Sequence, residues 1–581
     1  MNLINKTGEK IKKISEGKST GILTRLFSAW IITSVFFLVL NKENFTVFEF
    51  YDSINVMLFL ILVAVLWTSL CFIKSEKVVS VAMVTVSGLY CILGARACYD
   101  FYFLVGCCGI FSGIVFFARL EGIKIKLSKS LLWIGVCVLM LGFTVVIGVT
   151  CCLRYNNYWT PCYDFGIFSQ MFYYMKETGM ALVTCERDCL LSHFAVHFSP
   201  VFYLLLPIYM IFPTPLTLMI GQCALTASGV VPLIKICRNH GLTNLSSFVF
   251  GACYILYPAM AGGCNYYIHE NNFLAPLILW MILFMEKDNK LMSLVFGLGV
   301  LLVKEDAAVY VAAASLYFIF AHKNYKCSVM LFFISVAYFI GVTGYLSAYG
   351  DGVMTNRYDN YIYDDGGLFT VIKSVIQNPI YAVQQCFAEQ KIKYILQMLV
   401  PLMFMPVCTK RTSRLLLLIP FILVNLMTNY KYQYDIMFQY GMGSGSMLIY
   451  AAVINFGDMG KKRKKLLLCS VLSSAVIFTG TFRGWLMYYK SYDDYARQRE
   501  VLDYAVSLVP EDASVASGTF ILSNLSQRRK LYQLETTKNA AEFYVLDLRY
   551  DHDEYSVDDY QTDEFEEIFY SEDIVAVFKR K

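Results

Sequence analysis

The run "LLWIGVCVLMLGFTVVIGV" at residues 131–149 contains no charged side chain. A helix needs about 20 apolar residues to cross the hydrocarbon core of a bilayer, so this run predicts a membrane-spanning helix over residues 130–150. Similar runs recur along the chain and predict an all-α polytopic membrane protein with about fifteen transmembrane helices. The other predicted spans are residues 26–40, 54–74, 78–96, 101–118, 215–236, 246–261, 272–286, 291–303, 306–321, 328–349, 393–408, 413–428, 443–456 and 466–484.

The composition also indicates a membrane protein. Of the 581 residues, 57% are hydrophobic and 16% are charged, whereas about a quarter of the residues in a soluble domain are charged. The formal net charge of +5 comes from inter-helix loops and not from one basic stripe, so we expect no nucleic-acid partner. Cys162, Cys185 and Cys189 share one polar loop and could form a disulfide on an oxidising face.

The Lys and Arg residues predict the orientation of the helices, because short cytoplasmic loops carry an excess of them. The basic segments are the N-terminal tail and residues 74–77, 119–129, 235–241, 286–290, 322–326, 409–414 and 461–465. The remaining loops, expected outside, are residues 41–53, 151–197, 262–272, 350–392 and 429–442. The two sets alternate only if the proline-broken stretch 197–213 does not span, so we expect a re-entrant or surface-lying segment there.

These features divide the chain into four parts. Residues 1–25 are a basic cytoplasmic tail, and residues 26–118 are an added membrane module of four helices. Residues 130–484 are the membrane core, with long outer loops at 151–214 and 350–392. Residues 485–581 alternate helix and strand patterns, which predicts a small α/β domain on the extracytoplasmic side. Its predicted elements are a helix in "YARQREVLDYAVSLVP", a mixed segment in "NLSQRRKLYQL" and strands in "ASVASG", "AEFYVLDLRY" and "DIVAVFKRK".

The predicted outer loops gather unusual polar residues. Ionisable groups at membrane depth are costly and normally face a cavity or one another, so a shared site is the leading hypothesis. Its members lie in the first long loop, in "NYYIHENN" and in "LLVKEDAAV": Asp164, Glu186, Asp188, His193, His197, His269, Glu270, Lys304, Glu305 and Asp306.

Each motif has a second interpretation. Asp164 could cap a helix that begins at Ile167, and Lys304 could form a self-neutralising turn with the two carboxylates that follow it. His193 and His197 have the spacing of a metal pair, but the preferred interpretation is that they are hydrogen-bonding histidines at the membrane interface. The Asp-Phe-Gly triplet is not a kinase motif, because no glycine-rich loop or H-R-D loop accompanies it. "HENNF" lacks the second histidine of the H-E-x-x-H zinc signature.

Together the groups suit transfer from a lipid-linked donor to a polar acceptor. A carboxylate can take the proton of an acceptor hydroxyl as general base, and cationic side chains can hold a departing phosphate. We assign Asp164 as the base, and we assign phosphate or other substrate contacts to Lys304, His269, Arg357, Gln170, His197 and Glu270. Glu305 and Asp306 are candidate ligands of a divalent cation; no other cofactor is expected.

Four ordered strings carry a resemblance to a known family: "YDFGIFSQMFYYMKETG", "HFAVHFSPVFYLLLPIYMIFPTPLTLMIGQ", "YYIHENNFLAPLILW" and "GLGVLLVKEDAAVYV". In order and spacing they resemble a bacterial and archaeal membrane family, domain of unknown function 2079, over roughly residues 130–550. That family is similar in layout to the GT-C superfamily of polyprenyl-phosphate-sugar glycosyltransferases. The chain departs from the family at Ser523 and Asn524, where a Pro-His pair is expected, and at Gln439, where histidine is common.

The resemblance implies a function. It places Asp164 at the position of the base in the first outer loop of GT-C enzymes, after a first core helix at 130–150. It also implies an integral-membrane glycosyltransferase that uses a polyprenyl-phosphate lipid as sugar carrier and an envelope glycan or protein as acceptor. A transporter or lipid flippase is the main alternative, although matching broken helices in two halves are not seen. A non-catalytic envelope-assembly protein is the third.

Overall fold

The computed structural model describes residues 2–40, 54–121, 125–321, 325–352, 354–363, 367–550 and 554–581. Seven helical stretches in these ranges are long and apolar enough to cross a membrane. They are Gly21–Leu40, Glu76–Ala97, Lys129–Asn156, Pro215–Asn239, Asn244–Tyr266, Lys326–Tyr349 and Arg463–Phe482. The protein is therefore mainly helical with several membrane-length helices, while the expected number of about fifteen is not reached by length alone. The predicted outer loop 41–53 lies outside the described residues.

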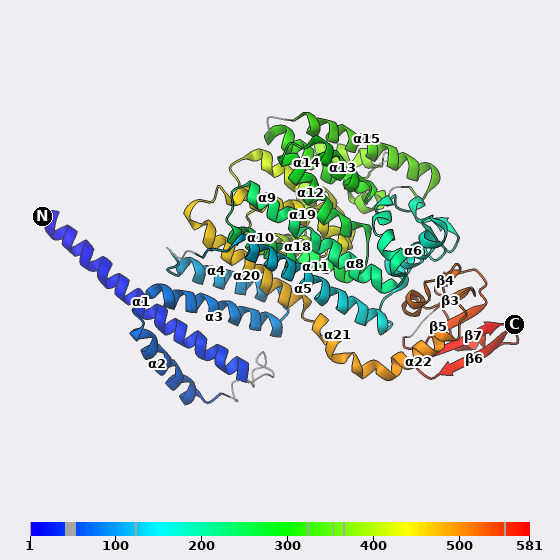
Figure 1. Cartoon of the computed structure of the whole chain (residues 1–581), viewed down its shortest axis with the longest axis horizontal. Helices are drawn as coiled ribbons and strands as arrows, with labels where there is room; N and C mark the ends of the chain where they lie inside the picture. The colour runs from blue at the N-terminus through cyan, green and yellow to red at the C-terminus, as the bar shows by residue number, and fades with distance from the viewer. Residues whose placement is uncertain are drawn as a thin grey trace.

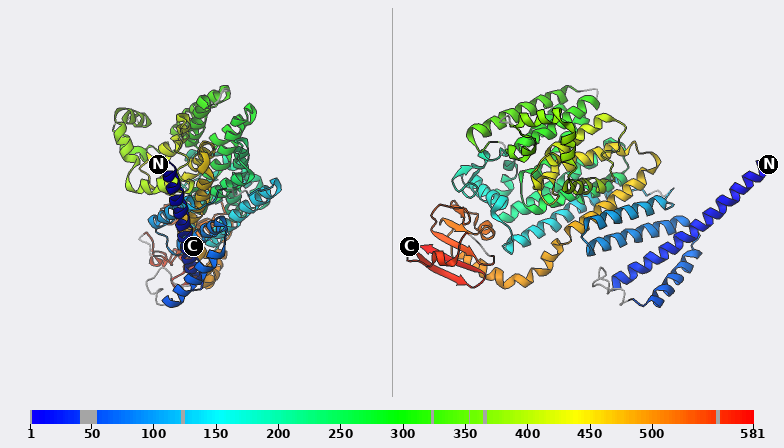
Figure 2. Two further views of the ribbon diagram at one scale, coloured as in Figure 1. Left: turned by 90° about the vertical axis from the view of Figure 1, so that its left-hand side faces the viewer. Right: turned by 180° about the vertical axis from the view of Figure 1, so that it is seen from behind.

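The N-terminal part consists of α1 (Asn2–Leu40), α2 (Val56–Phe72), α3 (Glu76–Ala97) and α4 (Phe101–Phe117). The predicted tail 1–25 is not separate from the first span, because α1 is one helix from Asn2 onward. Helices α3 and α4 pack against α20 of the core, and the N-terminal end of α1 extends away from the rest of the molecule (Figures 1 and 2).

The membrane core contains many helices shorter than a bilayer. Its helices are α5 (Lys129–Asn156), α6 (Ile167–Thr178), α7 (Leu206–Ile211), α8 (Pro215–Ser228), α9 (Val230–Asn239), α10 (Asn244–Ile255), α11 (Pro258–Tyr266), α12 (Leu274–Glu286), α13 (Lys290–Leu301), α14 (Ala308–Ala321), α15 (Lys326–Tyr349), α16 (Leu368–Gln377), α17 (Pro379–Cys386), α18 (Glu389–Leu399), α19 (Met442–Phe456), α20 (Arg463–Phe482) and α21 (Trp485–Ser491). Short one-turn helices, Glu270–Phe273 and Glu305–Ala307, precede α12 and α14. These polar turns lie where the predicted spans 272–286 and 306–321 begin.

Two predicted spans, 393–408 and 413–428, are not regular helices. Helix α18 ends at Leu399, and Met403 and Phe404 have positive φ values of 49° and 55°. Residues Thr412–Leu418 form a 3-10 helix and Phe421–Leu426 a π-helix. An apolar run could not reveal these breaks, because they depend on tertiary polar contacts. Buried Asn425, for example, donates to the backbone carbonyls of Gln433 and Tyr440.

The stretch 197–213 forms a 3-10 turn, Pro200–Leu204, followed by the six residues of α7. Neither segment is long enough to span a bilayer, as the charge distribution required. Leu204, Ile208 and Ile211 on this stretch are exposed, which suits contact with lipid at the membrane surface.

The C-terminal part is a mixed five-stranded sheet with the strand order β4-β3-β5-β7-β6. Its elements are α22 (Ala496–Ser507), β3 (Val515–Ser517), α23 (Thr519–Leu522), β4 (Leu531–Gln533), β5 (Phe543–Asp547), β6 (Phe565–Ser571) and β7 (Val575–Arg580). Strands β3, β4 and β5 are parallel, and β7 joins β5 and β6 antiparallel. The predicted helix and strands are present; β6, a largely exposed edge strand, was not predicted.

The sheet lies against the first outer loop, beside α6 and the short hairpin of β1 (Leu182–Val183) and β2 (Leu191–Ser192) (Figure 1). The Asp188 side chain accepts hydrogen bonds from the Thr537 hydroxyl at 2.5 Å and the Lys538 backbone N–H at 3.0 Å. The Gln533 amide donates to the Tyr163 hydroxyl at 2.8 Å. The C-terminal part therefore helps to fix the loop that carries Asp164.

Candidate active site

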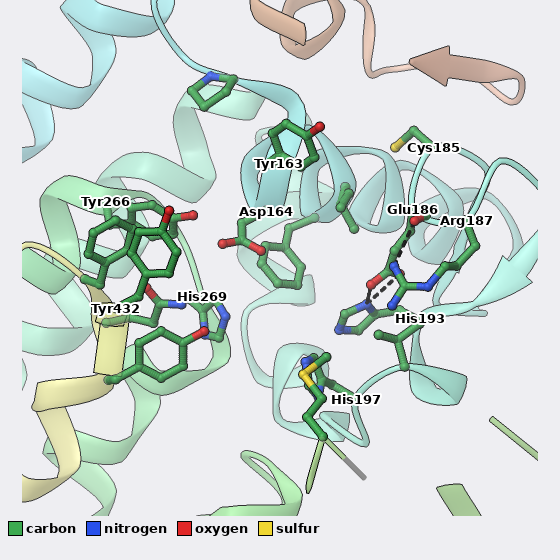
Figure 3. Close-up of a pocket in the computed structure, with 18 of the residues that line it drawn as sticks. Tyr163, Asp164, Cys185, Glu186, Arg187, His193, His197, Tyr266, His269 and Tyr432 are labelled. Carbon is green, nitrogen blue, oxygen red and sulfur yellow. Dashed lines mark hydrogen bonds and ion pairs between the residues drawn. The ribbon is translucent and has the colours of Figure 1, made fainter. Parts of the chain in front are cut away.

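A cavity of about 770 Å³ opens where the first outer loop, the α11–α12 junction, the segment around Arg357 and the tyrosine-rich segment 430–440 meet. Gln533 and Thr536 of the C-terminal part complete its wall. Figure 3 shows Asp164 between Tyr266 and Tyr432 on one side and His193 and Glu186 on the other. The residues named from the sequence that line the cavity are Asp164, Glu186, Asp188, His193, His197, His269 and Arg357.

Asp164 has a strained backbone. Its φ of 62° and ψ of −64° correspond to the rare γ-turn conformation, and such strain costs about 1–3 kcal/mol and clusters at functional sites. Within the described residues, the carboxylate makes no hydrogen bond to the backbone of α6, so the capping interpretation is wrong. Its partner is the Tyr266 hydroxyl. The strained turn thus directs a carboxylate into the cavity.

A second strained residue, the buried Tyr267, directly follows the cavity-lining Tyr266 and has φ 116° and ψ 179°. This region is essentially restricted to glycine. The guanidinium of Arg154 lies 4.7 Å from the centre of the Tyr267 ring and donates to the Asn265 carbonyl at 2.9 Å. These contacts stabilise the turn at Tyr267. The cavity-lining residues Tyr266 and His269 flank this turn in the sequence.

Lys304 lies behind the cavity wall at the centre of a buried charge network. Its ammonium is 3.0 Å from Glu270 Oε1, and both side chains are almost completely buried. The Lys304 Nζ is also 3.4 Å from His197 Nε2, while His197 Nδ1 is 3.0 Å from Glu305 Oε1. The interpretation of Lys304 as part of a self-neutralising turn is therefore wrong, since its direct partner, Glu270, lies on another segment.

The protonation states of this network follow from burial and from Lys304. Burial lowers the pKa of Lys304, but the charges of Glu270 and Glu305 outweigh it and raise the pKa above its ordinary value. Burial and the nearby Lys304 ammonium hold the pKa of His197 well below its usual range. His197 is then neutral: it accepts from Lys304 at Nε2 and donates to Glu305 from Nδ1.

His269 is also neutral. Burial lowers its pKa well below the ordinary value, and Lys304 adds to this effect against the opposing charge of Asp164. The Asn271 backbone N–H donates to His269 Nδ1 at 3.4 Å. Glu270 is 3.0 Å from the same nitrogen, but this contact is not aligned as a hydrogen bond. The proton therefore resides on Nε2, which leaves a donor at the cavity wall.

Glu186 and His193 form a second ionisable pair across the cavity from Tyr266. Glu186 Oε2 is 3.0 Å from His193 Nδ1, and both side chains are buried. Burial alone would lower the pKa of His193, but the charge and hydrogen bond of Glu186 outweigh it and raise the pKa. The sequence placed both residues in one loop without pairing them; their separation of seven residues gave no specific signal.

Arg357 lies between aromatic rings, 4.8 Å from the Tyr430 centroid and 5.3 Å from the Tyr440 centroid. No carboxylate within the described residues forms an ion pair with its guanidinium. Cation–π contacts orient a guanidinium and leave its N–H groups available. The contact between Arg357 and these tyrosines has no local sequence signal, because 70 residues or more separate them.

A family model described as "Predicted membrane protein (DUF2079)" matches residues 154–569, most of the chain. The chain belongs to the DUF2079 family. No curated protein matches the DUF2079 chain. Among solved structures, it is similar to the crystal structure of ArnT from Cupriavidus metallidurans bound to undecaprenyl phosphate. The two share 11% identity with a TM-score of 0.45, over 76% of this chain and 97% of ArnT.

The remaining acidic residues predicted for the site of this DUF2079 protein do not line the cavity. Glu270 and Glu305 belong to the layer behind the cavity, and the charge of Asp306 acts on Lys304 and Arg357. Within the described ranges, no three His, Cys, Asp or Glu side chains are arranged to hold a metal ion. A cation at Glu305 and Asp306 would therefore need ligands from a substrate. The His193 and His197 rings are 6.2 Å apart and pair with carboxylates instead.

The three cysteines of the first long loop form no disulfide in this structure. Cys162, Cys185 and Cys189 are all free, so the structure contains none of the disulfides considered above. The Cys162 thiol contacts the Cys185 thiol and also packs against Gly166, where a Cβ would lie 2.7 Å from Cys162 Sγ. Gly166 has φ −63°, so glycine is needed there for close packing and not for the turn.

Gln170 does not line the cavity of the DUF2079 protein. It is completely buried, and its amide donates to Thr184 Oγ1 at 2.8 Å and to the Arg528 carbonyl at 3.1 Å. Its carbonyl accepts from the Thr184 backbone N–H at 2.9 Å. Gln170 therefore joins α6 to the C-terminal part, and its predicted role in substrate binding is replaced by a structural one.

Replacing Gln170 with alanine is expected to destabilise the protein by about 1–3 kcal/mol, because buried partners lose their hydrogen bonds. The C-terminal part should then be cleaved faster in limited proteolysis of the purified protein. The exposed Gln384 on α17 provides the control, and Gln384→Ala should leave the cleavage rate unchanged. Equal rates for both variants would contradict the docking role of Gln170.

Proposed function

We propose that this protein is an integral-membrane glycosyltransferase that moves a sugar from a polyprenyl-phosphate carrier to an acceptor on the extracytoplasmic face. The observation that carries the proposal is the strained Asp164 carboxylate in a large cavity that also contains the unpaired Arg357 guanidinium. A base and an anion-binding group in one cavity fit transfer chemistry with a phosphate leaving group.

In the proposed reaction the acceptor hydroxyl oxygen attacks the anomeric carbon of the sugar. Asp164 takes the hydroxyl proton as the new glycosidic bond forms. The bond between the anomeric carbon and the phosphate oxygen breaks, and polyprenyl phosphate leaves with the electron pair. Arg357 donates to the phosphate oxygens, and the Nε2–H of His269 is a second donor on the same wall.

Lys304 acts on the leaving phosphate from behind the wall. Its side chain is only 2% exposed, so it supports the site through its field and through His197, without direct contact. Glu270 and Glu305 stabilise the Lys304 ammonium, and burial and this ammonium keep His197 neutral. Glu305 and Asp306 do not line the cavity, so the proposed reaction assigns no divalent cation to them.

The cavity also has groups that fit a sugar. Its aromatic wall consists of Tyr163, Tyr266, Tyr430, Tyr432, Phe438 and Tyr440. Aromatic faces bury apolar surface while tyrosine hydroxyls remain available for hydrogen bonds. With the charge-based orientation, this wall faces outside, the N-terminus is cytoplasmic and the C-terminal sheet is extracytoplasmic.

The proposed phosphate contact predicts the effect of Arg357→Ala. Losing a charge-assisted hydrogen bond costs about 1.5–3 kcal/mol, so donor affinity should fall by about 10- to 150-fold. Binding of a polyprenyl-phosphate sugar to the purified protein measures the effect. Arg357→Lys should recover only part of the affinity, because lysine cannot form the bidentate contact.

The matched control is Lys176→Ala, which removes an exposed cation on α6 that is paired with Glu177. Its donor affinity should equal that of the wild type. If both variants weaken binding equally, the effect is one of overall charge and the assignment of Arg357 is wrong.

A further inference from the structure

A second cavity, called here the basic cavity, lies at the other end of the membrane core. It has a volume of about 980 Å³ and lies between the C-terminal ends of α14 and α19 and the segment 410–416. Helix α14 begins directly after Glu305–Ala307 beside the active-site network and ends at Ala321, which lines the basic cavity. Helix α19 likewise begins next to Tyr440 and ends beside Gly457. The two cavities therefore lie at opposite ends of the same helices.

These helices are too short to cross a bilayer core. Helix α14 has 14 residues and α19 has 15, which correspond to about 21–23 Å at 1.5 Å per residue. A hydrocarbon core is about 30 Å thick. The two helices alone therefore do not separate the cavities by a full bilayer core, which suits entry of a lipid headgroup into a cavity from the side.

The rim of the basic cavity has an excess of positive charge. Arg414 is buried and already neutralised by Asp458, at 2.7 Å. The exposed Arg411 is 3.9 Å from the same carboxylate, and Lys410 has no ion pair within the described residues. The lining of the basic cavity therefore contains one carboxylate, that of Asp458, and three cations, those of Lys410, Arg411 and Arg414. His240 adds no free charge, because it is paired with Glu286 at 2.6 Å.

Apolar side chains lie directly beside these cations. Phe320, at the end of α14, is 70% exposed, and Leu416 and Ile454 complete the wall. A small soluble anion would use only the cations, whereas a lipid uses both surfaces: its phosphate contacts the cations and its acyl chain covers the apolar wall.

We propose that the basic cavity binds the headgroup of an anionic phospholipid, with the phosphate held by Lys410 and Arg411 and the acyl chains lying against Phe320. This site lies outside the proposed transferase site and does not depend on its activity. The bound lipid stabilises the end of the bundle where α9, α14 and α19 terminate.

The test is thermal unfolding of the delipidated full-length protein in detergent, with phosphatidylglycerol, phosphatidylcholine or inorganic phosphate added. Ligands of the native state raise the unfolding temperature with concentration. Phosphatidylglycerol should give a saturable increase, and the two other additives should not. An equal increase with phosphatidylcholine or with inorganic phosphate alone would overturn the anionic-lipid assignment.

Two variants locate the binding. The double change Lys410→Ala and Arg411→Ala should raise the half-saturating phosphatidylglycerol concentration about tenfold or more, since each cation near an anionic surface contributes about a fivefold factor. Gly457→Phe should do the same without removing charge. Gly457 has φ −57°, and its added Cβ would meet only the Ile454 carbonyl at 4.0 Å, so the ring can fill the cavity without strain.

Lys464→Ala is the matched control, because Lys464 is an exposed cation at the start of α20 that does not line the basic cavity. It should leave the half-saturating concentration unchanged. If Lys464→Ala weakens binding as much as the double variant, or if Gly457→Phe has no effect, binding reflects diffuse surface charge and the cavity is not a lipid site.

Discussion

Replacing Asp164 with asparagine is expected to reduce the rate of sugar transfer by about 10²- to 10⁴-fold, the contribution of a general base. Asparagine has nearly the same shape as aspartate and tolerates positive φ better than most residues, so the fold of the turn should persist. The measurement is the transfer rate from a polyprenyl-phosphate sugar, with kcat and donor KM determined separately. A loss in kcat with little change in KM is the expected pattern for a base.

A second variant at the same position separates function from stability. Asp164→Gly removes the backbone strain, because glycine adopts positive φ freely. We expect the unfolding free energy to rise by up to about 1–3 kcal/mol while transfer is lost. A glycine variant that is both less stable and inactive would indicate that Asp164 acts by holding the loop.

Replacing Lys304 with methionine should have the largest effect on stability. The change leaves Glu270, which is completely buried, without its cation, and breaking a buried ion pair by removing one partner typically costs about 3–5 kcal/mol. Thermal unfolding in detergent should show a large decrease for Lys304→Met. The exposed Lys290 at the start of α13 provides the control, and Lys290→Met should change stability little.

The double variant Lys304→Met with Glu270→Gln tests whether the unpaired carboxylate of Glu270 causes the loss of stability. With neither charge present, most of the lost stability should return, because the main cost is the unpaired carboxylate. Transfer activity should remain low, since the field behind the leaving phosphate is absent. If the double variant is as unstable as Lys304→Met, the unpaired carboxylate of Glu270 is not the cause of the lost stability, which contradicts the proposed ion pair.

Local sequence patterns predicted much of the fold. Apolar runs predicted α5, α15 and α20. The charge distribution predicted that residues 197–213 do not span the membrane, and their helices are short. The patterns failed where tertiary contacts break a helix, as at Met403 and Asn425. A buried asparagine that bonds two backbone carbonyls has the same sequence appearance as a polar residue in an ordinary helix.

The sequence predicted many residues of the site but not the contacts between them. Asp164, His197, His269 and Arg357 line one cavity as expected, because ionisable groups in a membrane protein normally face a cavity or one another. Sequence spacing could not show that Lys304 pairs with Glu270 and not with its chain neighbours. It also could not show that Gln170, six residues after Asp164, points away from the cavity toward the C-terminal sheet.

The most direct test is release of polyprenyl phosphate by sealed proteoliposomes that contain the purified protein, labelled polyprenyl-phosphate sugars and an acceptor extract. The proposal predicts that the wild type converts donor to polyprenyl phosphate with label appearing in the acceptor, and that Asp164→Asn does so at least 100-fold more slowly. Movement of unchanged lipid-linked sugar across the bilayer, at equal rates for both proteins and without any polyprenyl phosphate, would contradict it and favour a flippase.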